Sequence, residues 1–404
     1  MDTKIQVTDL IKIFGRSSKS AAVALDLLKR GTSKDDILAR TGSVVAVSHT
    51  TLSVGEGEMF MVMGLSGSGK STLVRCLNRL IEPTSGTVHV DGENVFEMNE
   101  RELRELRRTR MSMVFQNFAL LPHKTVLENV EYGLKVRNEP RPAREAKAAE
   151  TLALVGLGGW EYHYPDNLSG GMQQRLGLAR ALASDPDILL MDEPFSALDP
   201  LIRNDMQNEL LELQGRLRKT IVFITHDFQE AIKLGDRIAI MKDGEIVQVD
   251  RPDVLVAHPA DGYVAKFTRE IDRGRVFTAE SIMHAAEATI PEGSTIGAAS
   301  RRLNGADLEC AFVLNEDGKP VGYVRVDDLS AAGAQTGGQP VRRHVCTDFR
   351  CVAPGRRLVE LYGLCRRGVP LAVVDVDGRF LGQVDTLDIL DRLTAGQDPE
   401  EGAG

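Results

Sequence analysis

A glycine-rich segment at residues 64–71, GLSGSGKS, fits the spacing G-x-x-x-x-G-K-[ST] in full. Glycines let the backbone curl so that successive N–H groups face one anion, and a lysine and a hydroxyl at these positions suit phosphate and Mg²⁺. A strand-like apolar run, 59–63, precedes the segment, and 72–80 has helical spacing. A plain Gly/Ser turn is the alternative, but this context predicts a nucleotide site made by Gly64, Leu65, Ser66, Gly67, Ser68, Gly69, Lys70, Ser71 and Thr72.

A second group of residues that could take part in chemistry is the acidic pair in ILLMDEP, residues 188–194. A buried strand would deliver Asp192 and Glu193 to its carboxyl end, where open α/β sheets bind their ligands. Asp192 would hold Mg²⁺, and Glu193 would orient and deprotonate the attacking water. An apolar strand ending in a polar turn would look the same in isolation, but a phosphate loop upstream favours the catalytic interpretation.

The segment LSGGMQQRLGLARAL, residues 168–182, is similar to the signature motif of ABC-transporter ATPases. Ser169, Gly170 and Gly171 would open a helix whose free N–H groups form an anion site, although a simple helix cap is the alternative. In the family, two cassettes pair head to tail, and each ATP lies between one phosphate loop and the other chain's signature. The resemblance therefore implies a homodimer in which these residues and Gln173 contact ATP.

Further positions match the family in order. Gln116, in MVFQNFALLPH, resembles the glutamine that reaches Mg²⁺ and water and senses the membrane partner. Asp199, in SALD, resembles the aspartate that crosses the dimer interface, and His226, in VFITHD, resembles the histidine that contacts the γ-phosphate. The resemblance thus assigns catalysis to Lys70, Gln116, Glu193 and His226, and metal binding to Ser71, Gln116 and Asp192. Phe14, in KIFG, is the candidate for stacking on adenine, with a core phenylalanine as the alternative.

These residues need strands and helices to position them. Residues 4–14 alternate like a strand, 17–42 have helical spacing, and apolar strand-sized runs recur at 188–191 and 221–225. Strands alternating with helices predict a parallel sheet. The mainly helical segment 118–185 interrupts the alternation. The expected fold class is α/β, a P-loop NTPase with a RecA-like parallel core sheet, additional antiparallel strands and an inserted helical subdomain.

After about residue 272 one pattern occurs twice, at 311–329 and at 371–389, with a constant offset of sixty residues. Each copy predicts a strand, an Asp-Gly turn, a strand and a helix start, and two such units would pack together to bury their open faces. The pair resembles tandem CBS domains of βαββα type. We therefore expect a nucleotide-binding domain at 1–272, a CBS pair at 273–392 and a flexible tail at 393–404.

The CBS pair departs from the pattern of nucleotide-binding members of that family. Those carry a hydroxyl residue three positions before the conserved aspartate. Here Arg325 precedes Asp328 and Asp385 precedes Asp388. An aspartate would repel a phosphate, so a structural, dimerising or ionic-strength-sensing role is expected in place of adenosine-nucleotide binding.

Longer stretches resemble the ATPases of glycine betaine, proline betaine and choline importers. They are GLSGSGKSTLVRCLNRLIEPTSG, MVFQNFALLPHKTVLENV, SALDPLIRNDMQNELLELQ and GDRIAIMKDGEIVQVDRP, and the helical insert at 17–42 also fits this branch. The resemblance implies ATP hydrolysis with Mg²⁺, a homodimer, and integral membrane permease subunits that dock near 118–126. It also implies a periplasmic or extracellular solute-binding protein, and a peripheral location on the cytoplasmic face of the cell (inner) membrane.

Composition restricts the alternatives. The formal net charge is −9, which argues against a nucleic-acid partner, because proteins that bind nucleic acids generally present a basic surface. No run of about 18 apolar residues occurs, so any work at a membrane is expected to go through a partner. Three other functions stay open: a soluble ABC ATPase acting on ribosomes or DNA, an importer ATPase for a different solute, and a nucleotide-gated regulator without turnover. Only one phosphate loop and one signature occur, and Glu193 and His226 argue against the last.

Overall fold

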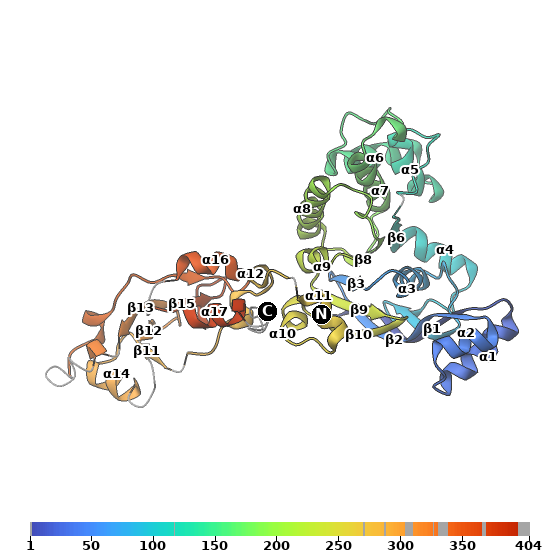
Figure 1. Cartoon of the computed structure of the whole chain (residues 1–404). Helices are drawn as coiled ribbons and strands as arrows, with labels where there is room; N and C mark the ends of the chain where they lie inside the picture. The colour runs from blue at the N-terminus through green and yellow to red at the C-terminus, as the bar shows by residue number, and fades with distance from the viewer. Residues whose placement is uncertain are drawn as a thin grey trace, which may run out of the picture. The chain divides into compact units, whose positions relative to one another are not determined.

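The computed structural model describes residues 2–394 except 117, 270, 287, 304–309, 326, 330–337 and 366–368. The chain divides into two compact units, Met1–Thr268 and Arg269–Gly404 (Figure 1). Residues 395–404 of the expected tail lie outside the described residues.

The first unit is built on a six-stranded sheet with the order β10-β9-β3-β8-β7-β6. Its strands are β3 (Met59–Met63), β6 (Met111–Val114), β7 (Ile188–Asp192), β8 (Thr220–Thr225), β9 (Arg237–Lys242) and β10 (Glu245–Asp250). All neighbours are parallel except β9 and β10. Strands β3, β7 and β8 are buried along their whole length, as a parallel sheet covered on both faces requires. The carboxyl ends of these three strands therefore meet at one edge.

A second, antiparallel sheet has the order β2-β1-β4-β5. Its strands are β1 (Thr3–Phe14), β2 (Val44–Gly55), β4 (Ser85–Val90) and β5 (Glu93–Asn94). One apolar core joins its side chains to those of β3, of α3 (Lys70–Leu77) and of α4 (Glu100–Thr109). The predicted helical insert forms α1 (Ser18–Lys29) and α2 (Lys34–Thr41), which pack on β1 and β2 through Ala24, Leu28 and Ile37.

The segment between β6 and β7 is helical, as predicted. It contains α5 (Val126–Val136), α6 (Arg141–Leu154), the 3₁₀ turn η1 (Pro165–Asn167) and α7 (Gly170–Leu182). Together with α8 (Pro200–Leu217) these helices form a lobe beside the sheets (Figure 1). The first unit ends with α9 (Phe228–Leu234), α10 (Pro252–Ala257) and α11 (Gly262–Thr268). Among the described residues, no helix is both long and apolar enough to span a bilayer.

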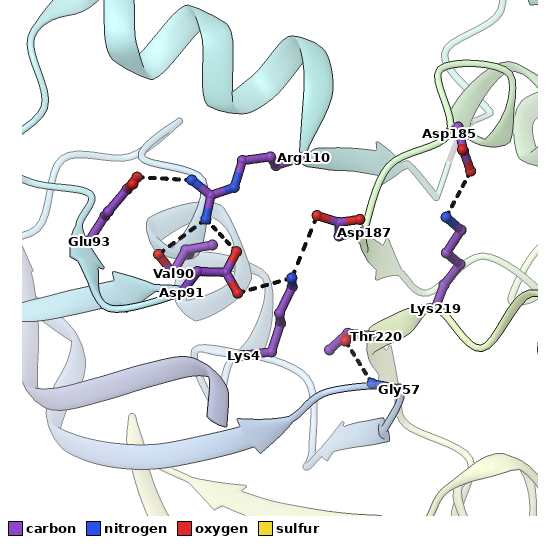
Figure 2. A network of polar contacts seen from close by, with 10 residues as sticks. All are labelled: Lys4, Gly57, Val90, Asp91, Glu93, Arg110, Asp185, Asp187, Lys219 and Thr220. Carbon is purple, nitrogen blue, oxygen red and sulfur yellow. Dashed lines mark hydrogen bonds and ion pairs between the residues drawn. The ribbon is translucent and has the colours of Figure 1, made fainter. Parts of the chain in front are cut away.

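A polar network links the two sheets at the end of the strands remote from Asp192 (Figure 2). Lys4 of β1 pairs with Asp91 at 2.9 Å and with Asp187, just before β7, at 3.5 Å. Arg110, which follows α4, also pairs with Asp91, and with Glu93 at 2.9 Å. These contacts fix the antiparallel sheet to the amino end of β7 and leave the carboxyl ends free for chemistry.

The second unit contains two three-stranded sheets of equivalent order, β11-β12-β13 and β14-β15-β16. The strands are β11 (Thr289–Pro291), β12 (Cys310–Leu314), β13 (Pro320–Arg325), β14 (Cys351–Val352), β15 (Leu371–Val374) and β16 (Phe380–Val384). The helices are α12 (Arg273–Val276), α13 (Ala279–Ile282), α14 (Ile296–Leu303), η2 (Val341–His344), α16 (Leu358–Leu361), η3 (Tyr362–Leu364) and α17 (Thr386–Thr394). In each sheet the first pair is parallel and the second antiparallel.

The two repeats turn in the same way and pack on each other, as their sequences predicted. Gly318 and Gly378 occupy the same turn position with φ of 76° and 80°, which glycine adopts without steric cost. The N–H of Phe380 donates to the carbonyl of Gly318 at 3.0 Å. The rings of Phe312 and Phe380 lie 5.3 Å apart in the apolar core between the sheets. The repeats therefore form one compact body.

Candidate nucleotide-binding site

The glycine loop follows β3 and is enclosed by backbone on two sides. Gly64 has φ of 155° and Gly69 has φ of 99°, values that favour glycine. A Cβ atom at Gly64 would collide with the carbonyl of Met241 at the end of β9, and one at Gly69 with the carbonyl of Ala46 in β2. The spacing of glycines in the motif is therefore required by packing as well as by the curl of the loop.

Lys70 is the first residue of α3, and its side chain turns back over the loop. Its Nζ donates to the carbonyls of Gly64 at 2.9 Å and Leu65 at 3.0 Å. Burial lowers the pKa of Lys70, while the charges of Glu193 and Asp192 act in the opposite direction. The ammonium group therefore lies in the loop with the acidic pair close enough to influence it.

Asp192, the last residue of β7, meets the first turns of α3. Ser71 Oγ donates to Asp192 Oδ1 at 2.8 Å, and the Arg75 guanidinium contacts Oδ2 at 3.1 Å. Ser71 and Arg75 are four residues apart and so share one helix face. The Asp192 side chain is 2% exposed. A hydroxyl and a buried carboxylate side by side are hard oxygen donors of the kind Mg²⁺ prefers, so the residues fit that ion.

Glu193 adopts an unusual backbone conformation at the end of the same strand. Its φ is 48°, which is uncommon for a non-glycine residue, and its N–H donates to the carbonyl of Ile224 in β8. Backbone strain of this kind clusters at functional sites. The carboxylate lies 3.1 Å from Nδ1 of His226, which follows β8. The structure therefore brings Lys70, Ser71, Asp192, Glu193 and His226 to one edge of the sheet.

Gln116 lies just beyond β6, and its side chain is exposed. The described residues that follow, Phe118 and Ala119, have φ of 55° and 49°. Arg180 of α7 donates to both of their carbonyls, at 2.8 Å and 2.5 Å. Burial lowers the pKa of Arg180. The helix that begins at the signature thus holds the segment after Gln116, a role for Arg180 that the sequence analysis missed.

The signature residues and Asp199 lie together but apart from the glycine loop. Ser169 caps α7 by accepting from the N–H of Met172 at 3.4 Å, and Asp199 caps α8. Gly170 faces Leu198, and Gly171 faces Ile202. Gln173 donates to the carbonyl of Pro165 at 3.0 Å. Residues 64–71 and 168–173 are all described, and no hydrogen bond or ion pair joins the two groups. Their contact with ATP stays a prediction.

Phe14 ends β1 and pairs with Val44 of β2. Ala46, two residues further along β2, is the residue whose carbonyl packs against Gly69. Phe14 is 44% exposed, and the ammonium of Lys12 lies 4.9 Å from the centroid of its ring. The strand register thus places Phe14 two positions from the residue that packs against Gly69, and stacking on adenine stays a prediction.

Tyr263 of α11 contacts the glycine loop, and this is a second contact that the sequence analysis missed. Its hydroxyl accepts from the N–H of Leu65 at 3.5 Å and donates to the carbonyl of Met241 at 3.4 Å. Tyr263 is 198 residues from Leu65. No local pattern in the sequence marks such a contact.

A glycine loop after one strand, an acidic strand end and a helical lobe inserted between them define an ATP-binding cassette. Matches to family models agree: "ABC transporter" covers residues 47–196 and "CBS domain" covers 279–334. A solved dimer of the ATP-binding cassette MJ0796, in a post-hydrolysis state bound to ADP and Pi, is 32% identical with a TM-score of 0.51. The similarity covers 61% of this chain and 98% of that one.

Other relatives match a larger share of the chain and indicate which transporter ATPases it resembles. The glycine betaine/carnitine transport ATP-binding protein GbuA of Listeria monocytogenes is 53% identical over 81% of this chain and 82% of its own length. The glycine betaine/proline betaine transport system ATP-binding protein ProV of Escherichia coli is 45% identical over 95% of each chain. The chain therefore belongs to the ABC transporter ATP-binding proteins, and it carries a C-terminal CBS domain.

Proposed function

We propose that this chain hydrolyses ATP to drive the import of a small quaternary ammonium solute such as glycine betaine, proline betaine or choline. The observation that carries the proposal is the shared edge of the sheet. There, Ser71 contacts Asp192 at 2.8 Å and His226 contacts Glu193 at 3.1 Å, next to the loop that ends in Lys70. The solute class is supported by the names of relatives, GbuA and ProV among them.

The geometry supports a direct attack by water. The loop N–H groups and Lys70 would bind the β- and γ-phosphates. Ser71 and Asp192 would hold Mg²⁺, which when bound neutralises part of the phosphate charge. Glu193 would accept a proton from the attacking water, and the oxygen of that water would bond to the γ-phosphorus. The bond from the γ-phosphorus to the β–γ bridging oxygen would break at the same time, which gives ADP and phosphate. His226, held by the Glu193 carboxylate, would orient toward the γ-phosphate.

A homodimer would complete each site. Ser169, Gly170, Gly171 and Gln173 make no polar contact with the glycine loop of their own chain. The free N–H groups at the start of α7 suit a phosphate supplied by a second chain. The MJ0796 cassette, similar over 98% of its length, is a dimer. We propose the same head-to-tail pairing here, with Asp199 at the interface.

Permease subunits would dock on the segment 118–126, at the cytoplasmic face of the membrane. Buried Asn129 shapes this segment, because its amide donates to the carbonyls of Leu121, Lys124 and Thr125. Arg180 holds the start of the same segment and connects it to the signature helix. Movement of a docked permease could therefore be transmitted to both Gln116 and the signature. A periplasmic or extracellular protein would deliver the solute to the permease.

Transport in proteoliposomes tests the proposal. The chain would be reconstituted with its proposed permease and solute-binding protein, and uptake of labelled glycine betaine and choline would be measured with ATP inside. We expect uptake of at least one of them, and none of glycine, which lacks the methyl groups. ATP-dependent uptake of glycine alone, or ATP hydrolysis without any uptake, would contradict the solute class.

A further inference from the structure

Three side chains of the second unit converge at the start of α17. His284 Nε2 lies 2.8 Å from Asp385 Oδ2 and 3.3 Å from Asp388 Oδ2. One ligand atom from each of these residues lies within 4.8 Å of the other two. An imidazole and two carboxylates at this spacing are a set of donors that a single metal ion can share.

Main-chain contacts position the residues that carry these side chains before any ligand arrives. His284 and Gln383 exchange two backbone hydrogen bonds, at 3.1 Å and 3.0 Å, across nearly one hundred residues of chain. The N–H of Asp385 donates to Asp388 Oδ2 at 2.9 Å, which orients the second carboxylate. A site whose ligands are held by main-chain contacts loses little conformational entropy when it binds.

The charges of the cluster favour a cation. Among the residues that the structure describes, the only ion-pair partner of Asp385 or Asp388 is His284. The side chains of His284, Asp385 and Asp388 are 42%, 40% and 33% exposed. The cluster therefore has an open side where water could complete a coordination shell. Its two carboxylates share His284 as their ion-pair partner.

We propose that His284, Asp385 and Asp388 bind one divalent transition-metal ion, of the class of Zn²⁺ or Mn²⁺. Imidazole is a preferred ligand of zinc, and carboxylates suit both ions. Mg²⁺ is a poorer fit because it prefers oxygen ligands alone. A bound ion would link the segment that follows α13 to the first turn of α17, and so would join the beginning of the tandem repeat to its end.

The first repeat provides the contrast. Arg325 occupies the position that corresponds to Asp385, and Asp328 corresponds to Asp388. A guanidinium would repel a cation where Asp385 attracts one. The site is thus particular to the second repeat, and Asp328→Asn is a matched control that removes the same charge from the equivalent place.

Calorimetric titration of the full chain, freed of metal and nucleotide, with ZnCl₂ and separately with MnCl₂ tests the proposal. We expect one ion per chain, with at least tenfold weaker binding in Asp385→Asn and in His284→Gln. Affinity should be unchanged in Asp328→Asn. Absence of binding, or equal binding by all three variants, would overturn the proposal.

A spectroscopic measurement on the unmodified protein provides a second test that no folding defect can affect. Electron spin echo modulation of the Mn²⁺-loaded chain should contain the ¹⁴N frequencies of a coordinated imidazole. A bound Mn²⁺ that lacks this modulation would contradict a role for His284. Circular dichroism melts would check that His284→Gln, at an exposed side chain, leaves the fold intact.

Discussion

Ser71 Oγ and Asp192 Oδ1 lie 2.8 Å apart, although 121 residues separate them in the chain. The contact joins the first turn of α3 to the last residue of β7, so the glycine loop and the strand that carries the acidic pair form one site. An acidic pair on the opposite edge of the sheet could not share a nucleotide with Lys70.

Replacing Lys70 should weaken nucleotide binding. Lys70→Ala removes the ammonium that now donates to two loop carbonyls and would be redirected to phosphate. Charge-assisted hydrogen bonds contribute about 1.5–3 kcal/mol, which corresponds to a roughly ten- to hundredfold loss of affinity. Fluorescent ATP titration measures it, with Lys147→Ala on the exposed side of α6 as control. Normal ATP binding by Lys70→Ala would count against the role of the loop.

Replacing Arg180 should reduce turnover without reducing ATP affinity. Arg180→Lys keeps the charge but loses the planar fork that donates to the carbonyls of Phe118 and Ala119. Without it the left-handed backbone at these residues should relax and displace Gln116. We expect kcat to fall about tenfold, equivalent to about 1.4 kcal/mol, with the Kd for ATP unchanged. Arg141→Lys, at an exposed position on α6, is the control, and a wild-type kcat in Arg180→Lys would refute the coupling.

The network of Figure 2 should make stability depend on pH through Asp91. Burial alone would raise the pKa of Asp91, but hydrogen bonds and charges from Lys4 and Arg110 outweigh it and lower that pKa. A lowered carboxyl pKa stabilises the fold above the unfolded-state pKa of about 4, and this contribution is lost as pH falls through the folded-state pKa.

Asp91→Asn removes the charge while it preserves the shape and the left-handed backbone, with φ of 50°. The carboxylate is a third exposed, so screening by solvent limits the expected loss to about 1 kcal/mol at pH 7. Chemical denaturation at a series of pH values should find a constant difference above about pH 5 that shrinks below about pH 4. A difference that grows toward acid would contradict the assignment.

Local motifs made this edge of the sheet predictable. Each of Lys70, Asp192, Glu193 and His226 lies at or next to the end of an element with its own sequence pattern, and parallel strands bring those ends together. The tandem repeat was equally visible, since its Asp-Gly turns recur at a fixed spacing.

What the sequence did not reveal depends on contacts between distant residues. The pairing of Arg180 with Phe118, and of Tyr263 with Leu65, follows from how helices pack on the core, which no short pattern encodes. Helix α3 was expected to continue to residue 80 but ends at Leu77. Asn78 there accepts the N–H of Leu80, and Arg79 takes a left-handed conformation, so side-chain chemistry overrides the apolar spacing.

The most direct test of the proposed chemistry is Glu193→Gln, a nearly isosteric change that removes the base. Removal of a general base costs about 10²–10⁴-fold in rate, while nothing in the glycine loop is altered. Light scattering coupled to size exclusion, run in saturating ATP and Mg²⁺ beside a phosphate-release assay, measures both consequences. We predict a stable ATP-dependent dimer with almost no phosphate released. A variant that remains monomeric in saturating ATP, or one that hydrolyses ATP at the wild-type rate, would contradict the account.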